Sequence, residues 1–360
     1  MTPADLSRTV LHAVRRAVDE DALRAPVPAR VRVERTRPGG SGDYACAVAL
    51  QLAGPAALPA LEVARILRER VAAEPGVGRV EITGPGFLSF TLDAPAESDR
   101  AVLAAVREQG LAYGHGYALR DEIHQFHHAR EVRAAVTAQA VFRLLVAQGA
   151  RGRITCEQAP DPDWVRLGVT VNAYGTPPTP LTEIRPVPAG ATAGELLERL
   201  GPDAARWGLL RAAGHDRAAL GPELLVQGEA NPLFRVRYAH ARARALTRGA
   251  TALGFTAEAA PYGESPAPYD RAARPLLDLI ADHPGVLLAG ARHRAPDRVA
   301  RQLEAVAHAF FDFHDSCPPL PAGDEKPSAA HRARLAIAEA AGTVLAGGLS
   351  LLGIRAPEHL

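Results

Sequence analysis

The chain has 360 residues, enough for two or three domains of ordinary size. Its 41 basic and 40 acidic residues give a net charge of +1, which excludes a uniformly basic nucleic-acid-binding surface and leaves only local clusters. Cys46, Cys156 and Cys317 are odd in number and far apart, so the sequence predicts neither a disulfide framework nor a cysteine zinc site.

The N-terminus lacks the pattern of a signal peptide, because Asp5, Arg8 and His12 interrupt its apolar residues. Every apolar run is shorter than the ~20 residues that a membrane-spanning helix needs. We therefore expect a soluble, cytoplasmic protein with no membrane partner.

The first 98 residues alternate helical and strand patterns. Apolar residues recur at helical spacing in 2–24 and in 58–71. Apolar and alternating runs predict strands at 77–82 and 87–90, joined by a tight turn. This pattern predicts a small α+β domain over residues 1–98.

Residues 99–228 carry a different pattern, in which helices alternate with short strands. A helix is predicted over 132–148, and strands are predicted at 154–156 and 167–171. Two further helices, at 193–200 and 203–213, complete what we predict to be an α/β segment.

Residues 229–360 show only helical patterns, which predict an all-α bundle. Asn231 and Pro232 suit the first turn of its first helix, where Phe234 and Tyr238 then share one side. The arginines around that side could hold a polyanion, although a buried helix with solvated arginines explains the pattern equally well. The predicted helices are 231–253, 268–281, 296–316 and 328–352.

Three segments of the C-terminal part are similar to the arginyl-tRNA synthetase family. The Asn-Pro pair and Tyr-Ala-His-Ala-Arg run in 231–242 resemble the start of that family's anticodon-binding helical domain. Segment 201–207 resembles the Gly-x-Asp-Ala-x-Arg-aromatic segment before it, and 334–358 resembles the last helix and tail. Their order and spacing match the family, which implies an anticodon-binding bundle over 229–360.

The N-terminal part resembles the additional domain of the same family, through segments 42–45 and 84–90. That domain contacts the D-loop region of tRNA, which implies Tyr44 and Phe87 as contacts. The family usually has Asn where Ala47 and Ser89 stand. Because amide side chains read base edges, we expect base reading to be reduced here.

The resemblance implies that residues 99–228 are a reduced Rossmann-like class I domain, short for a site that binds ATP, an amino acid and a tRNA end. Class I adenylation uses a His-x-Gly-His turn at a helix N-terminus. The best alignment places His128, Ala129, Arg130 and Glu131 there, so a side chain replaces the glycine and a carboxylate replaces the second histidine. The lysine of the family's mobile loop has no counterpart, since Lys326 is the only lysine. We expect no catalytic residues and no cofactor, ATP included.

A histidine cluster precedes that turn. His124, His127 and His128 could suggest a metal site. No cysteine or other obvious ligand nearby completes it, so we expect no metal. A solvated surface and a degenerate remnant of the ATP motif both explain the cluster. His314 with Asp312 and Asp315 is expected to have a structural role.

An anticodon loop is single-stranded, so proteins read it by stacking on bases and by hydrogen bonds to their edges. At Arg235 and Arg237 the family usually has Tyr and Gln, which predicts stronger phosphate binding and weaker sequence discrimination. The predicted tRNA-binding residues are Arg235, Arg237, Tyr238, His240, Arg242, Arg332 and Arg334.

The sequence thus predicts an α+β and α/β multidomain protein: a non-catalytic relative of the arginyl-tRNA synthetases that binds tRNA, in particular arginine isoacceptors. One alternative is a minimal, ATP-dependent arginine–tRNA ligase. Another is a protein-interaction module that has lost RNA binding and pairs with a synthetase or another protein.

Overall fold

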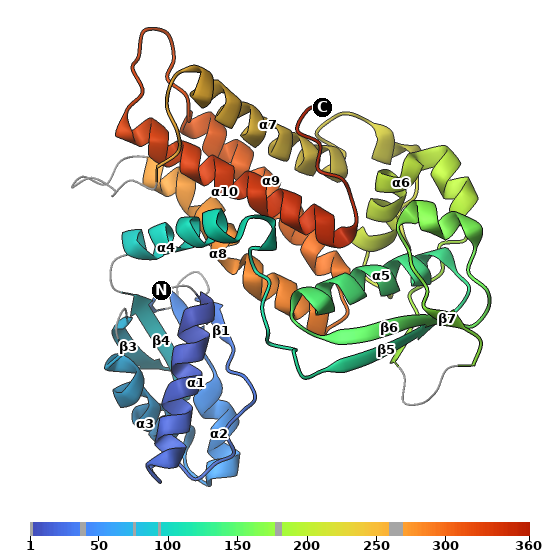
Figure 1. Cartoon of the computed structure of the whole chain (residues 1–360). Helices are drawn as coiled ribbons and strands as arrows, with labels where there is room; N and C mark the ends of the chain where they lie inside the picture. The colour runs from blue at the N-terminus through green and yellow to red at the C-terminus, as the bar shows by residue number, and fades with distance from the viewer. Residues whose placement is uncertain (1–2, 37–40, 75–76, 93–94, 177–181, 259–268) are drawn as a thin grey trace. The chain divides into compact units, whose positions relative to one another are not determined.

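The structure is a computed structural model that describes all residues except 1–2, 37–40, 75–76, 93–94, 177–181 and 259–268 (Figure 1). The chain forms two compact units, Met1–Val102 and Leu103–Leu360. Helix α4 (Pro95–Gln109) contains the boundary between them.

The unit Met1–Val102 is an antiparallel sheet packed with helices, as the α+β pattern predicted. The sheet has four strands in the order β1-β2-β4-β3. Its core includes Leu6, Leu67 and Phe90, all fully buried. The elements are α1 (Pro3–Asp19), β1 (Val33–Arg35), β2 (Tyr44–Cys46), α2 (Val48–Ala56), α3 (Ala60–Ala72), β3 (Val77–Thr83) and β4 (Phe87–Leu92).

The unit Leu103–Leu360 begins with a four-stranded parallel sheet in the order β7-β6-β5-β8. The strand predicted at 167–171 is wrong, because the chain turns at Gly168, where φ is +65°, and pairing starts later. The elements of this part are η1 (Gly110–Ala112), β5 (Ile123–His128), α5 (Val132–Ala147), β6 (Arg151–Cys156), η2 (Pro162–Leu167), β7 (Ala173–Tyr174), β8 (Thr182–Ile184), α6 (Ala193–Arg211) and η3 (Pro222–Leu225).

The two faces of this parallel sheet differ in exposure. Helix α5 lies along one face of β5 and β6 (Figure 1), and the paired residues Phe126 and Ile154 are buried. Side chains alternate between faces, so Ile123, Gln125 and Arg153 lie on the other, where Ile123 is 73% exposed. The Arg153 guanidinium donates to the Gln125 amide oxygen over 2.8 Å. Parallel sheets are usually buried on both faces, whereas this outer face leaves Ile123 and Arg153 exposed.

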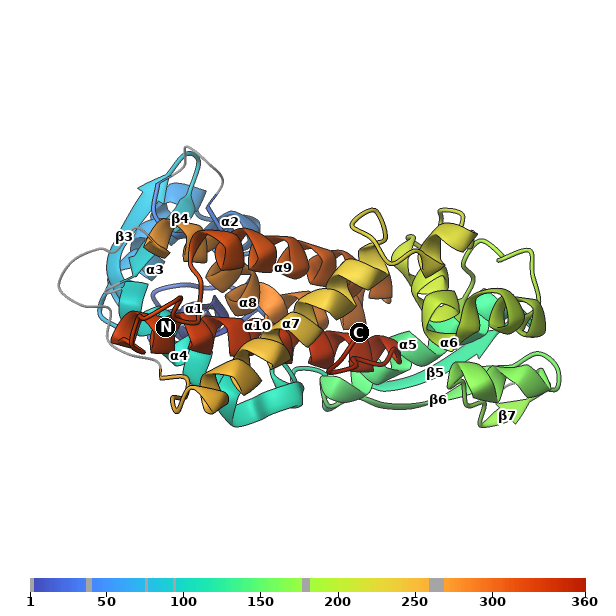
Figure 2. The same cartoon turned by 90° about the horizontal axis from the view of Figure 1, so that it is seen from above.

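Four helices complete the unit: α7 (Pro232–Ala252), α8 (Tyr269–Arg292), α9 (Pro296–Ser316) and α10 (Ala329–Leu352). Helix α7 packs against α9 and α10 (Figure 2). The predicted end of this helix at residue 281 is wrong, because α8 continues through Pro284 to Arg292. His283 is buried there and hydrogen-bonds Gln302 of α9 over 2.8 Å, so tertiary packing holds the helix together across the proline.

Helix α10 is long and apolar enough to cross a membrane, and α2 with α3 pass the same test as a pair bent by 119°. In α10, 72% of the most apolar window is buried inside the protein. Core helices of soluble proteins have this property too, so the test by length and composition carries little weight.

The segment 201–207 joins the helical bundle to the α/β part. Gly201 (φ +70°) kinks α6 just before Pro202. Arg206 then lies buried, and its Nε donates to the Leu352 carbonyl at the end of α10 over 2.8 Å. The same guanidinium donates to the Leu167 carbonyl at the end of η2. Burial lowers the pKa of Arg206 to about 9. This arginine therefore holds the ends of two helices together.

Candidate nucleic-acid interface

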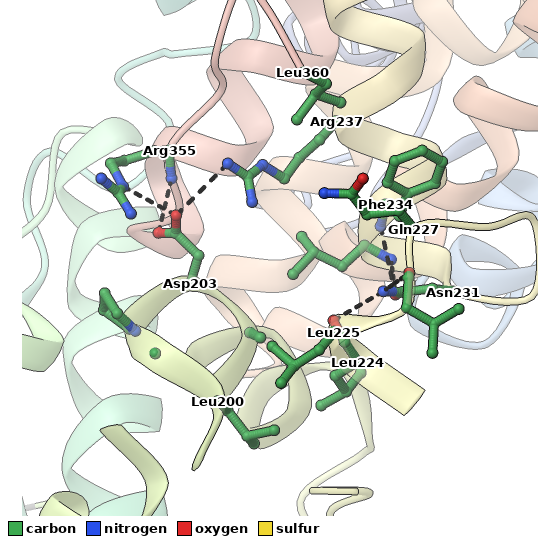
Figure 3. Close-up of a pocket in the computed structure, with 15 residues that line it drawn as sticks. Leu200, Asp203, Leu224, Leu225, Gln227, Asn231, Phe234, Arg237, Arg355 and Leu360 are labelled. Atoms are coloured by element: carbon green, nitrogen blue, oxygen red, sulfur yellow. Dashed lines mark hydrogen bonds and ion pairs between the residues drawn. The ribbon is translucent and has the colours of Figure 1, made fainter. Parts of the chain in front are cut away.

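Helix α7 starts at a fixed point because Asn231 bonds in two directions. Its side-chain oxygen accepts from the Leu233 amide over 3.0 Å, which caps the helix. Its side-chain NH2 donates to the carbonyls of Leu224 and Val226 over 2.8 and 2.9 Å (Figure 3). The Asn-Pro pair therefore fixes both the helix start and the preceding loop.

Three aromatic rings form a row from α7 to α9. Phe234 and Tyr238 stack with centroids 5.6 Å apart and planes 7° from parallel. Tyr238 in turn stacks on Phe311 of α9 at 5.5 Å and 23°. The Tyr238 side chain is 43% exposed, so its outer part is open to a ligand. Phe311 was not among the predicted residues, although Phe310, Phe311 and Phe313 mark α9 as aromatic in the sequence.

Arg235 and Arg242 lie on the α9 side of α7. The Arg235 guanidinium bonds His308 Nδ1 over 2.9 Å, and that of Arg242 lies 3.3 Å from His314 Nε2. Both histidines come from α9, which the sequence analysis did not connect with RNA. We name the surface formed by Phe234, Arg235, Tyr238, Arg242, His308, Phe311 and His314 the α7–α9 face.

The opposite side of α7 lies against the C-terminal tail. Arg244 pairs with Glu358 over 3.0 Å, and Arg237 turns to Asp203 at 3.9 Å. The carboxylate of Asp203 also accepts from the backbone and side chain of Arg355 over 3.2 and 2.9 Å. Arg244 and Arg237 therefore face carboxylates, whereas Arg248 donates to the Glu358 carbonyl and lies 3.4 Å from His359 Nδ1.

A pocket of about 260 Å³ adjoins the first turn of α7 (Figure 3). Leu200, Leu225 and Phe234 contribute apolar walls. Asp203 and Arg237 contribute polar groups, and the Nε of Arg237 is buried without a hydrogen-bond partner among the described residues. Apolar walls with a donor and an acceptor suit a planar heterocycle such as a nucleobase.

The remaining predicted residues of the bundle lie elsewhere. His240 is 5% exposed and bonds the Gly342 carbonyl of α10 over 3.0 Å, and burial lowers its pKa. It packs two helices together, so we leave it out of the proposed contacts. Arg332 pairs with Glu258 over 3.4 Å, beyond the end of α7, and Arg334 donates to the Pro318 carbonyl. These two arginines are not brought beside Tyr238.

In the unit Met1–Val102, the two predicted tRNA contacts differ in exposure. Tyr44 is 5% exposed within the sheet, whereas Phe87, at the start of β4, is 37% exposed. Ser89 is buried, and its hydroxyl lies 2.9 Å from that of Thr83. Phe87 is therefore the more accessible of the two.

The start of α5 carries the residues aligned with the ATP motif. His128 is 1% exposed and packs against Trp164, and burial lowers its pKa. Glu131 caps the helix: one carboxylate oxygen accepts from the Ala134 amide over 2.8 Å, and the other accepts from the Ala189 amide over 2.9 Å. A carboxylate thus occupies the helix N-terminus, where an anion would otherwise bind.

The histidine cluster is divided by the strand geometry. His124 bonds Glu122 over 3.0 Å, and His127 bonds Thr155 on the other face of the sheet over 3.0 Å. Within the described part of the chain, no group of three His, Cys, Asp or Glu residues could hold a metal ion.

The N-terminal and C-terminal parts of the chain each match a known domain family. Residues 5–92 match the family described as the arginyl-tRNA synthetase N-terminal domain, and residues 236–360 match the DALR anticodon-binding domain. The chain belongs to the arginyl-tRNA synthetase family. This confirms the resemblance and, with the fold, the predicted fold class.

Curated members of the arginyl-tRNA synthetase family resemble the chain over different lengths. The arginine–tRNA ligase of Frankia alni is 26% identical over 557 residues that cover all of both chains. That of Pseudarthrobacter chlorophenolicus is 38% identical over 169 residues, which cover 46% of this chain and 30% of the relative.

Solved structures of the arginyl-tRNA synthetase family share the fold. The Thermus thermophilus arginyl-tRNA synthetase superposes with a TM-score of 0.70 at 15% identity and covers all of both chains. The Plasmodium falciparum enzyme gives 0.66 at 8% identity, over 99% of each chain.

Proposed function

We propose that this protein binds tRNA through the α7–α9 face and the adjoining pocket, and that it does not charge the tRNA. The observation that carries the proposal is the half-exposed Tyr238 ring, stacked on Phe311 and placed between Arg235 and Arg242 along α7. A base can stack on such a ring while the arginines contact phosphates. The family match over 236–360 supports the anticodon loop as the bound part.

The first test is binding to a panel of tRNA transcripts across a salt series. We expect tighter binding of arginine tRNAs and an affinity that falls steeply with salt, because counterions are released from the phosphates. The double variant R235E/R242E should lose at least about tenfold in affinity. The matched control R120E/R166E reverses two exposed arginines outside the α7–α9 face and should bind as wild type does.

Other outcomes separate the alternatives. Equal binding of all tRNAs would mean that only shape and charge are recognised. No binding at low salt would refute the RNA proposal and favour the protein-interaction module, with a synthetase or another protein as partner. A soluble, cytoplasmic location and the division into 1–98, 99–228 and 229–360 remain predictions of the sequence.

Three observations support the loss of aminoacylation. The Glu131 carboxylate fills the N-terminus of α5 and opposes a triphosphate there. The alignment with the Frankia alni ligase extends over 557 residues, although this chain has 360. The outer face of the parallel sheet leaves Ile123 and Arg153 exposed, as expected for a shortened domain.

Pyrophosphate exchange tests this part of the proposal. We expect no exchange of labelled pyrophosphate into ATP with arginine and arginine tRNA at saturating concentrations. The wild-type protein must first be shown to bind the tRNA, so that inactivity cannot be blamed on misfolding. Any exchange above the protein-free blank would establish the minimal ligase instead.

A further inference from the structure

The arginines of α7 meet different acceptors: a carboxylate at Arg244, and imidazole nitrogens at Arg235, Arg242 and Arg248. Against the tail, Arg244 meets the carboxylate of Glu358 at 3.0 Å, which cancels much of its charge. On the α9 side, Arg235 and Arg242 meet imidazole nitrogens instead. A neutral imidazole accepts a hydrogen bond and leaves the guanidinium fully charged. Arg235 and Arg242 therefore keep their charge and have donors left for a further ligand.

Each of these histidines has a carboxylate on its far nitrogen. His308 Nδ1 accepts from Arg235, and its Nε2 faces Asp312 at 3.6 Å. His314 Nε2 accepts from Arg242, and its Nδ1 lies 3.2 Å from Asp315. A carboxylate favours the proton on the nitrogen that faces it, so the other nitrogen is free to accept. Two Arg–His–Asp chains thus run across the interface.

We propose that His308 and His314 are positioning residues that hold the guanidinium groups of Arg235 and Arg242 toward two phosphates of one RNA strand. The proposal rests on the proposed function and specifies how the α7–α9 face binds its ligand. The two arginines are two helical turns apart, about 10 Å along the axis, with Tyr238 between them. A base stacked on Tyr238 would then lie between the two phosphate contacts.

The chemistry of the guanidinium fits this role. It has five N–H donors in a planar fork, and one histidine nitrogen engages only one or two of them. The others remain available for phosphate oxygens, which bind arginine by paired hydrogen bonds. Fixing the side chain in advance reduces the conformational entropy that binding would otherwise cost.

A purely structural role explains His308 poorly. Its side chain is 65% exposed, and that of Asp312 is 67% exposed, so neither adds much packing to α9. Exposed polar pairs contribute little to stability. Replacing His308 should therefore leave the folded state intact, which makes it the better of the two histidines to test.

The test measures tRNA affinity across a salt series for paired variants. Alanine removes the acceptor in H308A and H314A. Asparagine in H308N places an oxygen near the position of Nδ1, and glutamine in H314Q places one near Nε2. The control H293A removes an exposed histidine just past the end of α8. Thermal unfolding of each variant checks that the fold is kept.

We expect H308A and H314A each to weaken binding about fivefold and to lower the salt slope by up to about one, as for a lost phosphate contact. H308N and H314Q should restore the affinity and the salt slope of the wild type, and H293A should change neither of them. In a double-mutant cycle, H308A should have no further effect once R235A is present.

The outcomes distinguish this inference from the proposed function. If wild type binds tRNA while H308A and H314A keep its affinity and salt slope, the positioning role is refuted and tRNA binding stands. Additive effects of R235A and H308A would refute it too. If wild type binds no tRNA at low salt, the proposed function fails and this inference fails with it.

Discussion

Buried polar side chains tie together segments of Leu103–Leu360 that lie far apart in the sequence. Arg133 of α5 is 1% exposed and donates to the carbonyls of Leu209, Ala213 and Asp216. In the sequence, Arg133 looks like an ordinary solvated arginine. Its partners are backbone carbonyls, and the sequence does not show where these lie. The sequence could name Arg206 only through the family motif.

His283 shows how such a residue makes stability depend on pH. Complete burial lowers its pKa to about 4, against the opposing effect of the hydrogen bond that His283 Nδ1 donates to the Gln302 side-chain oxygen. The unfolded chain, with an ordinary histidine pKa near 6.5, therefore binds more protons between these values. The free energy of unfolding is therefore highest above about pH 6.5. It falls by roughly 3 kcal/mol as the pH falls to about 4.

We expect H283Q to remove this share of the pH dependence, because glutamine stays neutral. Urea unfolding at pH 7.5 and 4.5 measures it, with the exposed-helix variant H12Q as control. A difference between the two pH values that is as large in H283Q as in wild type would contradict the assignment. His115, His128 and His240, whose pKa values burial also lowers, keep their own share of the pH dependence in every variant.

At the scale of elements, long apolar repeats were predictable and short strands were not. Helices α5, α7, α9 and α10 follow their predicted ranges closely, since each has a periodic buried side. Strand β5 was missed because three of its six residues are histidines, which hide the apolar pattern. His124 and His128 lie on the same face of β5 as Phe126, and His127 lies on the other face.

The end of α10 depends on one glycine. Gly353 has φ of +73°, and a Cβ there would lie 2.0 Å from Nη1 of Arg143 and 2.6 Å from Nη2 of Arg206. Arg206 cannot yield without losing its bond to the Leu352 carbonyl. Both strain and crowding should therefore oppose any side chain at this position.

A matched pair of variants separates these two effects. Gly190 has nearly the same φ, +70°, but open space around its Cβ position. We expect G190A to cost about 1 kcal/mol from backbone strain alone, and G353A about 3 kcal/mol. Urea unfolding at pH 7.5 gives both values. Equal losses would show that the arginines move aside freely.

At the scale of the whole molecule, the two compact units have separate cores, and each contains one of the two family matches. Only the α7 residues of the α7–α9 face could be predicted from the sequence. Its α7 residues carry the family motif, whereas Phe311, His308 and His314 belong to a helix whose contact with α7 no sequence pattern marks. Residues that act as partners across two helices become visible only when the helices are packed.

Separate cores predict two calorimetric transitions. L67A should lower only the transition of Met1–Val102, and L303A only that of Leu103–Leu360, because each leucine is fully buried in its own unit. Arginine tRNA at 100 times its Kd should stabilise the unit that binds it by about 2.7 kcal/mol. We expect the free energy of unfolding of Leu103–Leu360 to rise by that amount, and the temperature of its transition to rise with it.

The transition of Met1–Val102 reports on the predicted N-terminal contact. The temperature of this transition should rise less than that of Leu103–Leu360. Ala47 and Ser89 stand where the family usually has amide side chains. Tyr44 is buried, which leaves Phe87 as the exposed ring. F87A should remove that smaller rise and leave the other transition unchanged, whereas R235A/R242A should reduce the larger one. If tRNA raised only the Leu103–Leu360 transition, Phe87 would make no contact. A single transition that L67A and L303A lower alike would mean that the two units unfold together.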